Sequence, residues 1–244
     1  MPRMARAVIA GVPHHVTQRG NRREDVFFTD EDRRRYLELL KHYADKHGLE
    51  ILAYCLMSNH LHLVAIPRRA DSLARTLKPV HLRYAQHVNW TQHLSGRLWQ
   101  GRFFSCPLDD AHCLVAIRYV ERNPVRARMV ERAEEYNWSS APSHSGKRSD
   151  DLLSDHHELI GAIENWSEWL CEEGDPTVIS QLRQCTRTGR PLGDPSFIDR
   201  LEEKLGRILR PKPGGRPRKH RRKNRKHGQR PHVRIRAETR QEPT

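Results

Sequence analysis

Two apolar runs separated by a two-residue turn constrain the fold of this chain most strongly. Residues 49–57 (LEILAYCLM) and 60–66 (HLHLVAI) have the length of strands, and Pro67 ends the second run. Ser58 and Asn59 supply the turn between them. Because the first run is almost continuously apolar, it predicts a strand that is buried on both faces. The chain is therefore expected to hold a hairpin inside a sheet that is covered on both sides.

The second strand of this hairpin carries two histidines. Side chains alternate along a strand, so His60 and His62 share one face while Leu61 and Leu63 point into the opposite layer. Burying two polar rings without partners is costly, and imidazole is a common metal ligand. The pair predicts either packed structural histidines or a clamp for a metal ion.

The segments around the hairpin complete a recognisable order. Thr29 or Asp30 suits a helix start, Gly48 suits its end, and Pro124 disfavours helix at the residue before it. This order predicts an α+β fold with a ferredoxin-like antiparallel sheet. The expected elements are a strand at 7–18, a helix at 30–47, the two hairpin strands, a helix at 73–93, a strand at 98–108 and a helix from Asp109 or Asp110 to about 123.

The end of the third helix brings a tyrosine and an amide together. Tyr119 and Asn123 are four residues apart, so they lie on the same helix face. By this pattern alone, Tyr119 is a packed aromatic or a reactive group, and Asn123 is a helix-end residue or a ligand. Arg122 and Arg126 lie next to them and suit either phosphate contacts or a solvated helix face.

Charge is distributed unevenly along the chain, whose net charge is +14. Residues 1–148 carry 24 Lys and Arg against 15 Asp and Glu, and residues 207–236 carry 14 bases and no acid. Residues 149–182 carry nine acids and no base. A basic body with a basic tail predicts an acidic partner, for which nucleic acid is the usual case.

The five cysteines are scattered and form no C-x-x-C pair, which argues against a disulfide framework or a cysteine-type zinc site. No apolar run has the length of a membrane span, and no signal-peptide pattern opens the sequence. We therefore expect a cytoplasmic, nucleoid-associated protein with no membrane partner.

Several motifs resemble the single-tyrosine HUH transposases of the IS200-like type, and most closely the REP-associated tyrosine transposases. The resemblance rests on residues 57–62 (MSNHLH) and 119–127 (YVERNPVRA), with support from 15–20 (HVTQRG) and 98–103 (LWQGRF). It covers roughly residues 1–140. An H-x-H motif followed about sixty residues later by Y-x-x-x-N-P-V-R is a specific combination.

The resemblance implies a HUH endonuclease fold that cleaves and rejoins single-stranded or hairpin DNA. It implies that His60 and His62 bind a divalent metal, Mg²⁺ or Mn²⁺, with Asn123 as third ligand. Classical IS200-type members carry Gln at that position, whereas the REP-associated branch carries Asn. Tyr119 would attack the scissile phosphate and form a 5′-phosphotyrosine link. The resemblance leaves a monomer or a homodimer open, since classical relatives exchange helices in a dimer, whereas the REP-associated branch is taken as monomeric.

Other enzyme classes with similar histidine motifs do not fit. A histidine-triad hydrolase needs a third histidine where Val64 stands, and an H-x-H-x-D-H zinc hydrolase needs an acid and a histidine where Val64 and Ala65 stand. A non-catalytic DNA-binding protein on the same fold stays open, with Tyr119 as packing only. An RNA-binding protein would leave the histidine and tyrosine motifs unexplained.

The chain beyond the resemblance divides by composition. After a catalytic domain at 1–140, we expect an acidic helical extension at 141–182, a DNA-binding helical unit with Arg190 at 183–210, and a basic disordered tail at 211–244. The acidic part is either a packed extension or a cover for the basic face, in which case deleting residues 151–175 should raise DNA affinity. In the tail, Arg216 and Arg218 lie in a G-R-P-R sequence that resembles an AT-hook core, and the tail as a whole suits phosphate-backbone binding.

Overall fold

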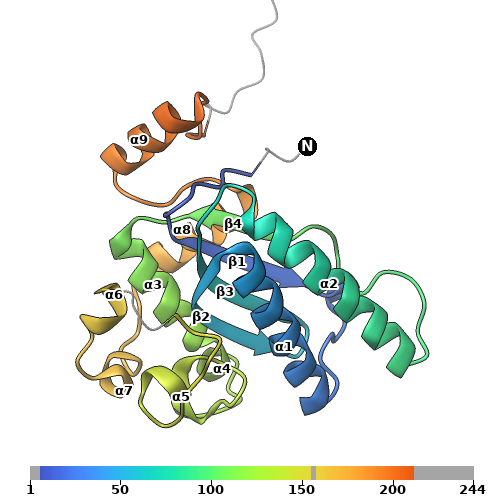
Figure 1. Ribbon diagram of the computed structural model, residues 1–244. Helices are drawn as coiled ribbons and strands as arrows, with labels where there is room; N and C mark the ends of the chain where they lie inside the picture. The colour runs from blue at the N-terminus through green and yellow to red at the C-terminus, as the bar shows by residue number, and fades with distance from the viewer. Residues whose placement is uncertain (1–5, 155–157, 212–244) are drawn as a thin grey trace, which may run out of the picture. The chain divides into compact units, whose positions relative to one another are not determined.

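The described residues, 6–154 and 158–211, contain one four-stranded antiparallel sheet with the strand order β2-β3-β1-β4 (Figure 1). The order of strands and helices up to α3 is the predicted one, so the computed structural model confirms the ferredoxin-like α+β plan. The strands are β1 (His14–Arg19), β2 (Leu49–Met57), β3 (His60–Pro67) and β4 (Phe104–Pro107). The helices are α1 (Asp30–His47), α2 (Ser72–Thr91), α3 (Asp110–Glu121), α4 (Asn123–Arg126), α5 (Ala141–His144), α6 (Glu158–Gly161), α7 (Trp166–Trp169), α8 (Pro176–Thr188) and α9 (Pro195–Leu205), with short 3-10 helices η1 (Asn21–Arg23) and η2 (Ala133–Glu135).

Local signals set the ends of α1 as predicted. The Thr29 side chain accepts a hydrogen bond from the backbone N–H of Asp32, and the Asp32 carboxylate accepts one in return from Thr29 N–H, which is a capping box. Gly48 ends the helix with a left-handed φ of 64°, which costs glycine little because it has no Cβ. Strand β2 therefore begins directly after Gly48.

A proline separates α3 from α4. The Asp109 side chain caps α3 by accepting from His112 N–H at 2.9 Å, and the helix ends at Glu121, two residues before the predicted end. Pro124 has no N–H to donate to the preceding turn, so α3 is not extended through it, and Pro124 lies in the first turn of a new short helix. Tyr119 is thus fixed on the last turn of α3, and Asn123 begins α4.

The two faces of the sheet are covered by different helices. Leu61 and Leu63 pack with residues of α1 and α2 on one face. Val64, which points the same way as His62, packs with residues of α3 and α8 on the other (Figure 1). The histidine pair therefore lies between the sheet and the second helical layer, as the alternation along β3 predicts.

The segment after residue 140 packs against this second face. Trp166, Leu170, Leu182 and Leu192 are buried in the same cluster as the sheet residues. Residues up to Arg210 form one compact unit. The division of the chain into the four segments expected from composition stays a prediction, but the acidic stretch 149–182 is in contact with the sheet.

The predicted first strand was too long. β1 begins at His14, because Gly11 turns the chain with a φ of 77° and residues before it leave the sheet. Ala7 and Ile9 are apolar for another reason: they are buried against Phe197 and Leu201 of α9.

The predicted strand at 98–108 was also wrong over most of its length. Only Phe104–Pro107 pairs with β1, and Trp99 makes an isolated bridge with Gly20. Trp99 and Phe103 are buried, but they pack against α1 and α2 as a loop and not as a strand.

Two helix ends fall earlier than predicted. α2 ends at Thr91 instead of residue 93, because His93 has a left-handed φ of 52°. The apolar spacing of residues 195–209 predicts a helix over this range, but α9 ends at Leu205, because Gly206 adopts a left-handed φ of 61°. Among the described residues, no helix combines the length and apolar character needed to cross a membrane.

Candidate functional site

The site is built around His60 and His62 on β3. Their ring centroids are 5.1 Å apart, and both rings lie on the face of the sheet below α3. Burial, reinforced by nearby Arg19 and Arg126, lowers the pKa of His60 to about 4. Burial also holds the pKa of His62 well below its usual range. Both rings are therefore neutral at physiological pH, the state in which imidazole can bind a metal.

Asn59 fixes the orientation of the His60 ring. The Asn59 amide nitrogen donates to the carbonyl of Arg23 at 3.0 Å, so its Oδ1 faces His60. The Nδ1 of His60 lies 2.6 Å from that oxygen and must carry the proton, since an amide oxygen only accepts. The Nε2 of His60 is consequently left with a free lone pair.

His62 is held by a second buried histidine. The rings of His15 and His62 are stacked with centroids 5.2 Å apart, and Nε2 of His15 lies 2.9 Å from Nδ1 of His62. On its far side, His15 Nδ1 lies 2.7 Å from the hydroxyl of Thr186 in α8. Burial lowers the pKa of His15 to about 3, so this ring is neutral as well.

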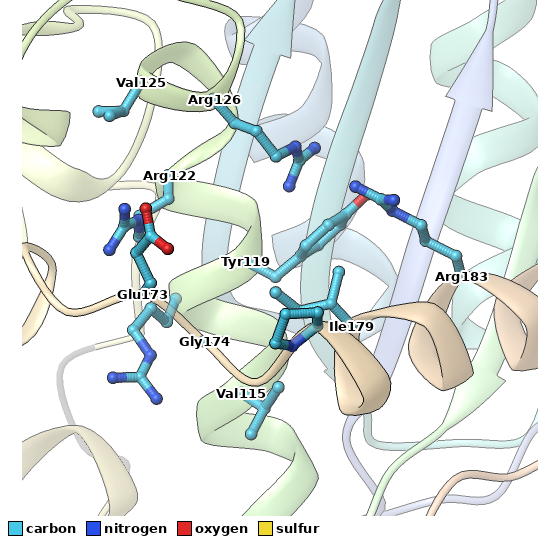
Figure 2. Close-up of a pocket in the computed structure, with 11 residues that line it drawn as sticks. Val115, Tyr119, Arg122, Val125, Arg126, Glu173, Gly174, Ile179 and Arg183 are labelled. Atoms are coloured by element: carbon cyan, nitrogen blue, oxygen red, sulfur yellow. The ribbon is translucent and has the colours of Figure 1, made fainter.

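Tyr119 faces the histidines from α3. Its side chain is 7% exposed, and its ring lies edge-on to His62 and His15, at centroid distances of 5.5 and 5.8 Å. Arg183 of α8 donates from Nε to the Tyr119 hydroxyl at 3.2 Å, and the Arg126 guanidinium lies 4.4 Å from the ring centroid (Figure 2). Two cations from different helices thus fix the tyrosine in place.

Asn123 is buried beside Tyr119. Its Nδ2 donates to the backbone carbonyls of Tyr119 and Val120 at 3.1 Å each, which leaves Oδ1 pointing away from the helix. That oxygen accepts from Arg126 Nη2 at 2.5 Å. The expected third ligand is therefore engaged by an arginine that also lies close to both histidines.

An arginine-rich pocket of about 400 Å³ opens beside Tyr119 (Figure 2). Arginines 118, 122, 126 and 183 line it, together with Glu173 and apolar residues. Such a surplus of fixed cations suits a polyanion such as the DNA backbone.

The acidic segment contacts two of these arginines. Arg118 Nη1 is 2.9 Å from a Glu172 carboxylate oxygen. Arg122 Nη1 donates to the backbone carbonyls of Cys171 and Glu172. Part of the segment at 149–182 therefore borders the basic pocket as well as packing against the sheet.

The model of the family described as "Transposase IS200 like" matches residues 9–123 of this chain. Residues 9–123, which are 115 of the 244 residues, therefore form an IS200-like transposase domain. By this match the chain is a DNA transposase, and the matched segment contains His15, both hairpin histidines, Tyr119 and Asn123.

One solved structure supports the fold of this transposase. A structure of a REP-associated tyrosine transposase bound to a REP hairpin matches with a TM-score of 0.51 and 16% identity, covering 65% of this chain and 100% of that chain. A transposase candidate from Deinococcus radiodurans R1 matches with a TM-score of 0.35 and 20% identity, over 50% and 97% of the two chains, a similarity too weak to bear on the fold. No curated protein sequence matches the chain.

The structure brings most of the predicted site residues of the transposase together. Tyr119, Asn123, Arg122 and Arg126 cluster at the end of α3, and Tyr119 faces the histidine pair. Arg190 does not line this pocket, and its guanidinium donates to the carbonyl of Leu209. Arg216 and Arg218 lie outside the described residues.

Three residues at the site of the transposase were not predicted. His15 belongs to a motif that contributed to the resemblance, but its contact with His62 depends on the pairing of β1 with β3. Thr186 and Arg183 lie on α8, far from the motifs in sequence. A sequence pattern signals neither contact, since both depend on how α8 packs over the sheet.

The donors at the site fit a hard divalent cation. His60 and His62 each present a ring nitrogen, and Asn123 presents an amide oxygen, a mixed set that suits Mg²⁺ or Mn²⁺ with positions left for phosphate. Within residues 6–154 and 158–211, no group of three or more His, Cys, Asp or Glu is arranged to hold a metal ion. A three-ligand set at this site would therefore need the amide oxygen of Asn123.

Proposed function

We propose that this transposase cleaves and rejoins single-stranded or hairpin DNA with Tyr119 as the nucleophile. The observation that carries the proposal is the contact of the Tyr119 ring with His62, at a centroid distance of 5.5 Å. The two residues come from α3 and β3, and their contact joins both halves of the predicted motif in one site. A tyrosine that only filled the core would not need a row of arginines beside it.

The chemistry exchanges one phosphoester for another. The Tyr119 oxygen attacks the scissile phosphorus, a bond from tyrosine oxygen to phosphorus forms, and the bond from phosphorus to the 3′ oxygen breaks. The phenolic proton leaves the tyrosine, and a proton is delivered to the 3′ oxygen, which departs as a hydroxyl. The 5′-phosphotyrosine link retains the phosphodiester energy, so attack by a 3′ hydroxyl reverses the step without ATP.

The other residues of the site have separate roles in metal binding, in positioning the tyrosine and in contacting the phosphate backbone. His60, His62 and Asn123 would hold a divalent metal, which supplies Lewis-acid polarisation of a phosphate oxygen when bound. Arg183 holds the Tyr119 hydroxyl by donating to it. Arg126 and Arg122 line the pocket in which the phosphate backbone would lie.

Hairpin DNA is the substrate class that the comparisons favour. The REP-associated tyrosine transposase of similar fold was solved with a REP hairpin bound. This chain also carries the Asn that the REP-associated branch has at the third ligand position.

The test is covalent capture of DNA by the protein. Hairpin oligonucleotides taken from the DNA that flanks the gene are incubated with the protein and Mn²⁺ or Mg²⁺, and adducts are resolved on denaturing gels. Mass spectrometry then maps the modified residue. We expect an adduct on Tyr119 that is absent in Tyr119→Phe, in His60→Ala and in the presence of EDTA.

The chain offers a matched control. Tyr43 on α1 also accepts a hydrogen bond from an arginine, Arg83 Nε at 2.7 Å, but it lies on the other side of the sheet. Tyr43→Phe should leave the adduct unchanged. Tight hairpin binding without any adduct would instead favour a non-catalytic DNA-binding protein, a reading that the low exposure of Tyr119 otherwise allows.

A further inference from the structure

A buried chain of hydrogen bonds runs from α8 to the face of β3. The Thr186 hydroxyl lies 2.8 Å from the carbonyl oxygen of Leu182 and 2.7 Å from His15 Nδ1. His15 Nε2 in turn lies 2.9 Å from His62 Nδ1. Thr186, His15 and His62 are 2%, 1% and 6% exposed, so water does not compete for these contacts.

The direction of each hydrogen bond in this series follows from the Leu182 carbonyl oxygen, at which the series ends. A carbonyl oxygen has no proton, so the short contact with Leu182 requires Thr186 to donate its hydroxyl proton there. The Thr186 oxygen is then an acceptor, and His15 must donate to it from Nδ1. The Cys106 sulfur, 3.2 Å from the same oxygen, is compatible with this arrangement as a second, weaker donor.

The remaining step determines which nitrogen of His62 is free. A neutral His15 that is protonated on Nδ1 has a lone pair on Nε2, so His62 must donate to it from Nδ1. Neutral His62 then carries its lone pair on Nε2. If His62 were protonated on Nε2 instead, its Nδ1 and the Nε2 of His15 would both carry lone pairs at a distance of 2.9 Å. The alternative would be to reverse the donor and acceptor in every hydrogen bond of the series, which the Leu182 carbonyl does not allow.

We propose that His15 and Thr186 are positioning residues that hold His62 in the tautomer whose Nε2 is free to bind a cation. The cation itself rests on the proposed function, whereas the tautomer does not. His15 receives its orientation from α8, which lies outside residues 9–123 that match the family. Partners of this kind orient ligand histidines in metal sites and typically change metal affinity by about 10- to 100-fold.

The tautomer can be measured directly in the metal-free protein. Long-range proton–nitrogen NMR spectra of ¹⁵N-histidine-labelled protein distinguish a ring protonated on Nδ1 from one protonated on Nε2. We expect His62 in the Nδ1-protonated form in the wild type and in Thr186→Ser, which keeps the hydroxyl. Thr186→Val removes the hydroxyl at nearly constant volume and should yield a mixture of tautomers.

Metal affinity supplies the second readout. Mn²⁺ titration followed by electron paramagnetic resonance, without DNA, should show about tenfold weaker binding for Thr186→Val and wild-type binding for Thr186→Ser. If Thr186→Val fails to fold, His15→Phe tests the same link, since it keeps a ring against His62 but cannot accept its proton.

The outcomes separate this inference from the proposed function. A wild-type His62 protonated on Nε2, or equal tautomer populations in Thr186→Val and the wild type, would overturn the positioning role. The expected tautomers with no Mn²⁺ binding in any protein would uphold the positioning role and remove the metal from the proposed function.

Discussion

Acid should destabilise this protein through histidines that are buried in the neutral state, and His81 offers the clearest test. Its ring lies in the core between Trp99 and Phe103, and its Nε2 is 3.1 Å from the Tyr36 hydroxyl. Burial, with a smaller effect from Arg6, lowers the pKa of His81 from 6.5 to about 3. Between these two values the unfolded chain binds a proton that the folded protein does not.

The sign and size of the effect follow from that difference. Because the folded pKa is depressed, the contribution of His81 is fully present above about pH 6.5 and is lost as the pH falls below it. At about pH 5 the loss is about 1.5 pH units at 1.36 kcal/mol each, or about 2 kcal/mol. Buried His14, whose pKa is lowered to about 4, adds a loss of similar size.

Urea unfolding of the wild type and His81→Gln at about pH 7.5 and about pH 5 measures this contribution. Gln retains a partner for the Tyr36 hydroxyl and does not titrate, so its stability should fall by about 2 kcal/mol less than that of the wild type. The control is His93→Asn, since His93 is exposed and Asn tolerates its φ of 52°. An equal fall in His81→Gln and the wild type would refute the reasoning.

Replacing Arg126 by Met should strengthen Mn²⁺ binding several-fold, because it frees the Asn123 oxygen and removes a positive charge beside the histidine pair; calorimetric titration checks this, and weaker binding would contradict it. Glu172→Gln should raise DNA affinity roughly twofold at low salt by freeing Arg118, with no difference at high salt. Fluorescence anisotropy tests that change better than deletion of residues 151–175, which would also remove buried core residues. Truncation after Arg210 should weaken binding to all DNA sequences alike and flatten its salt dependence in the same assay, and a sequence-selective loss would argue for an AT-hook.

The central fold was predictable because its signals are local. The hairpin at 49–66, the capping box at Thr29 and the glycine that ends α1 all lie within a few residues of the feature they determine. The shared face of His60 and His62 follows from alternation alone. Tyr119 was predictable as a candidate because its spacing to Asn123 puts both near one helix end.

The residues that were wrongly predicted to lie in strands have a different feature in common. Ala7 and Ile9 are as apolar as strand residues, but they are buried by α9, almost two hundred residues further along the chain. Trp99 and Phe103 belong to the core without belonging to the sheet. In each case the sequence indicates burial correctly, but the partner that buries the residue is distant in the chain.

The packing of α8 over the sheet has a consequence for how this protein can be divided. The family model matches residues 9–123, yet the hydroxyl that contacts His15 and the arginine that donates to the Tyr119 hydroxyl both come from residues 176–188. A chimera that joined residues 1–140 to the C-terminal part of another family member would inherit the motifs without their supports. In this transposase the unit that can be exchanged between relatives is set by burial, and it extends well beyond the residues that identify the family.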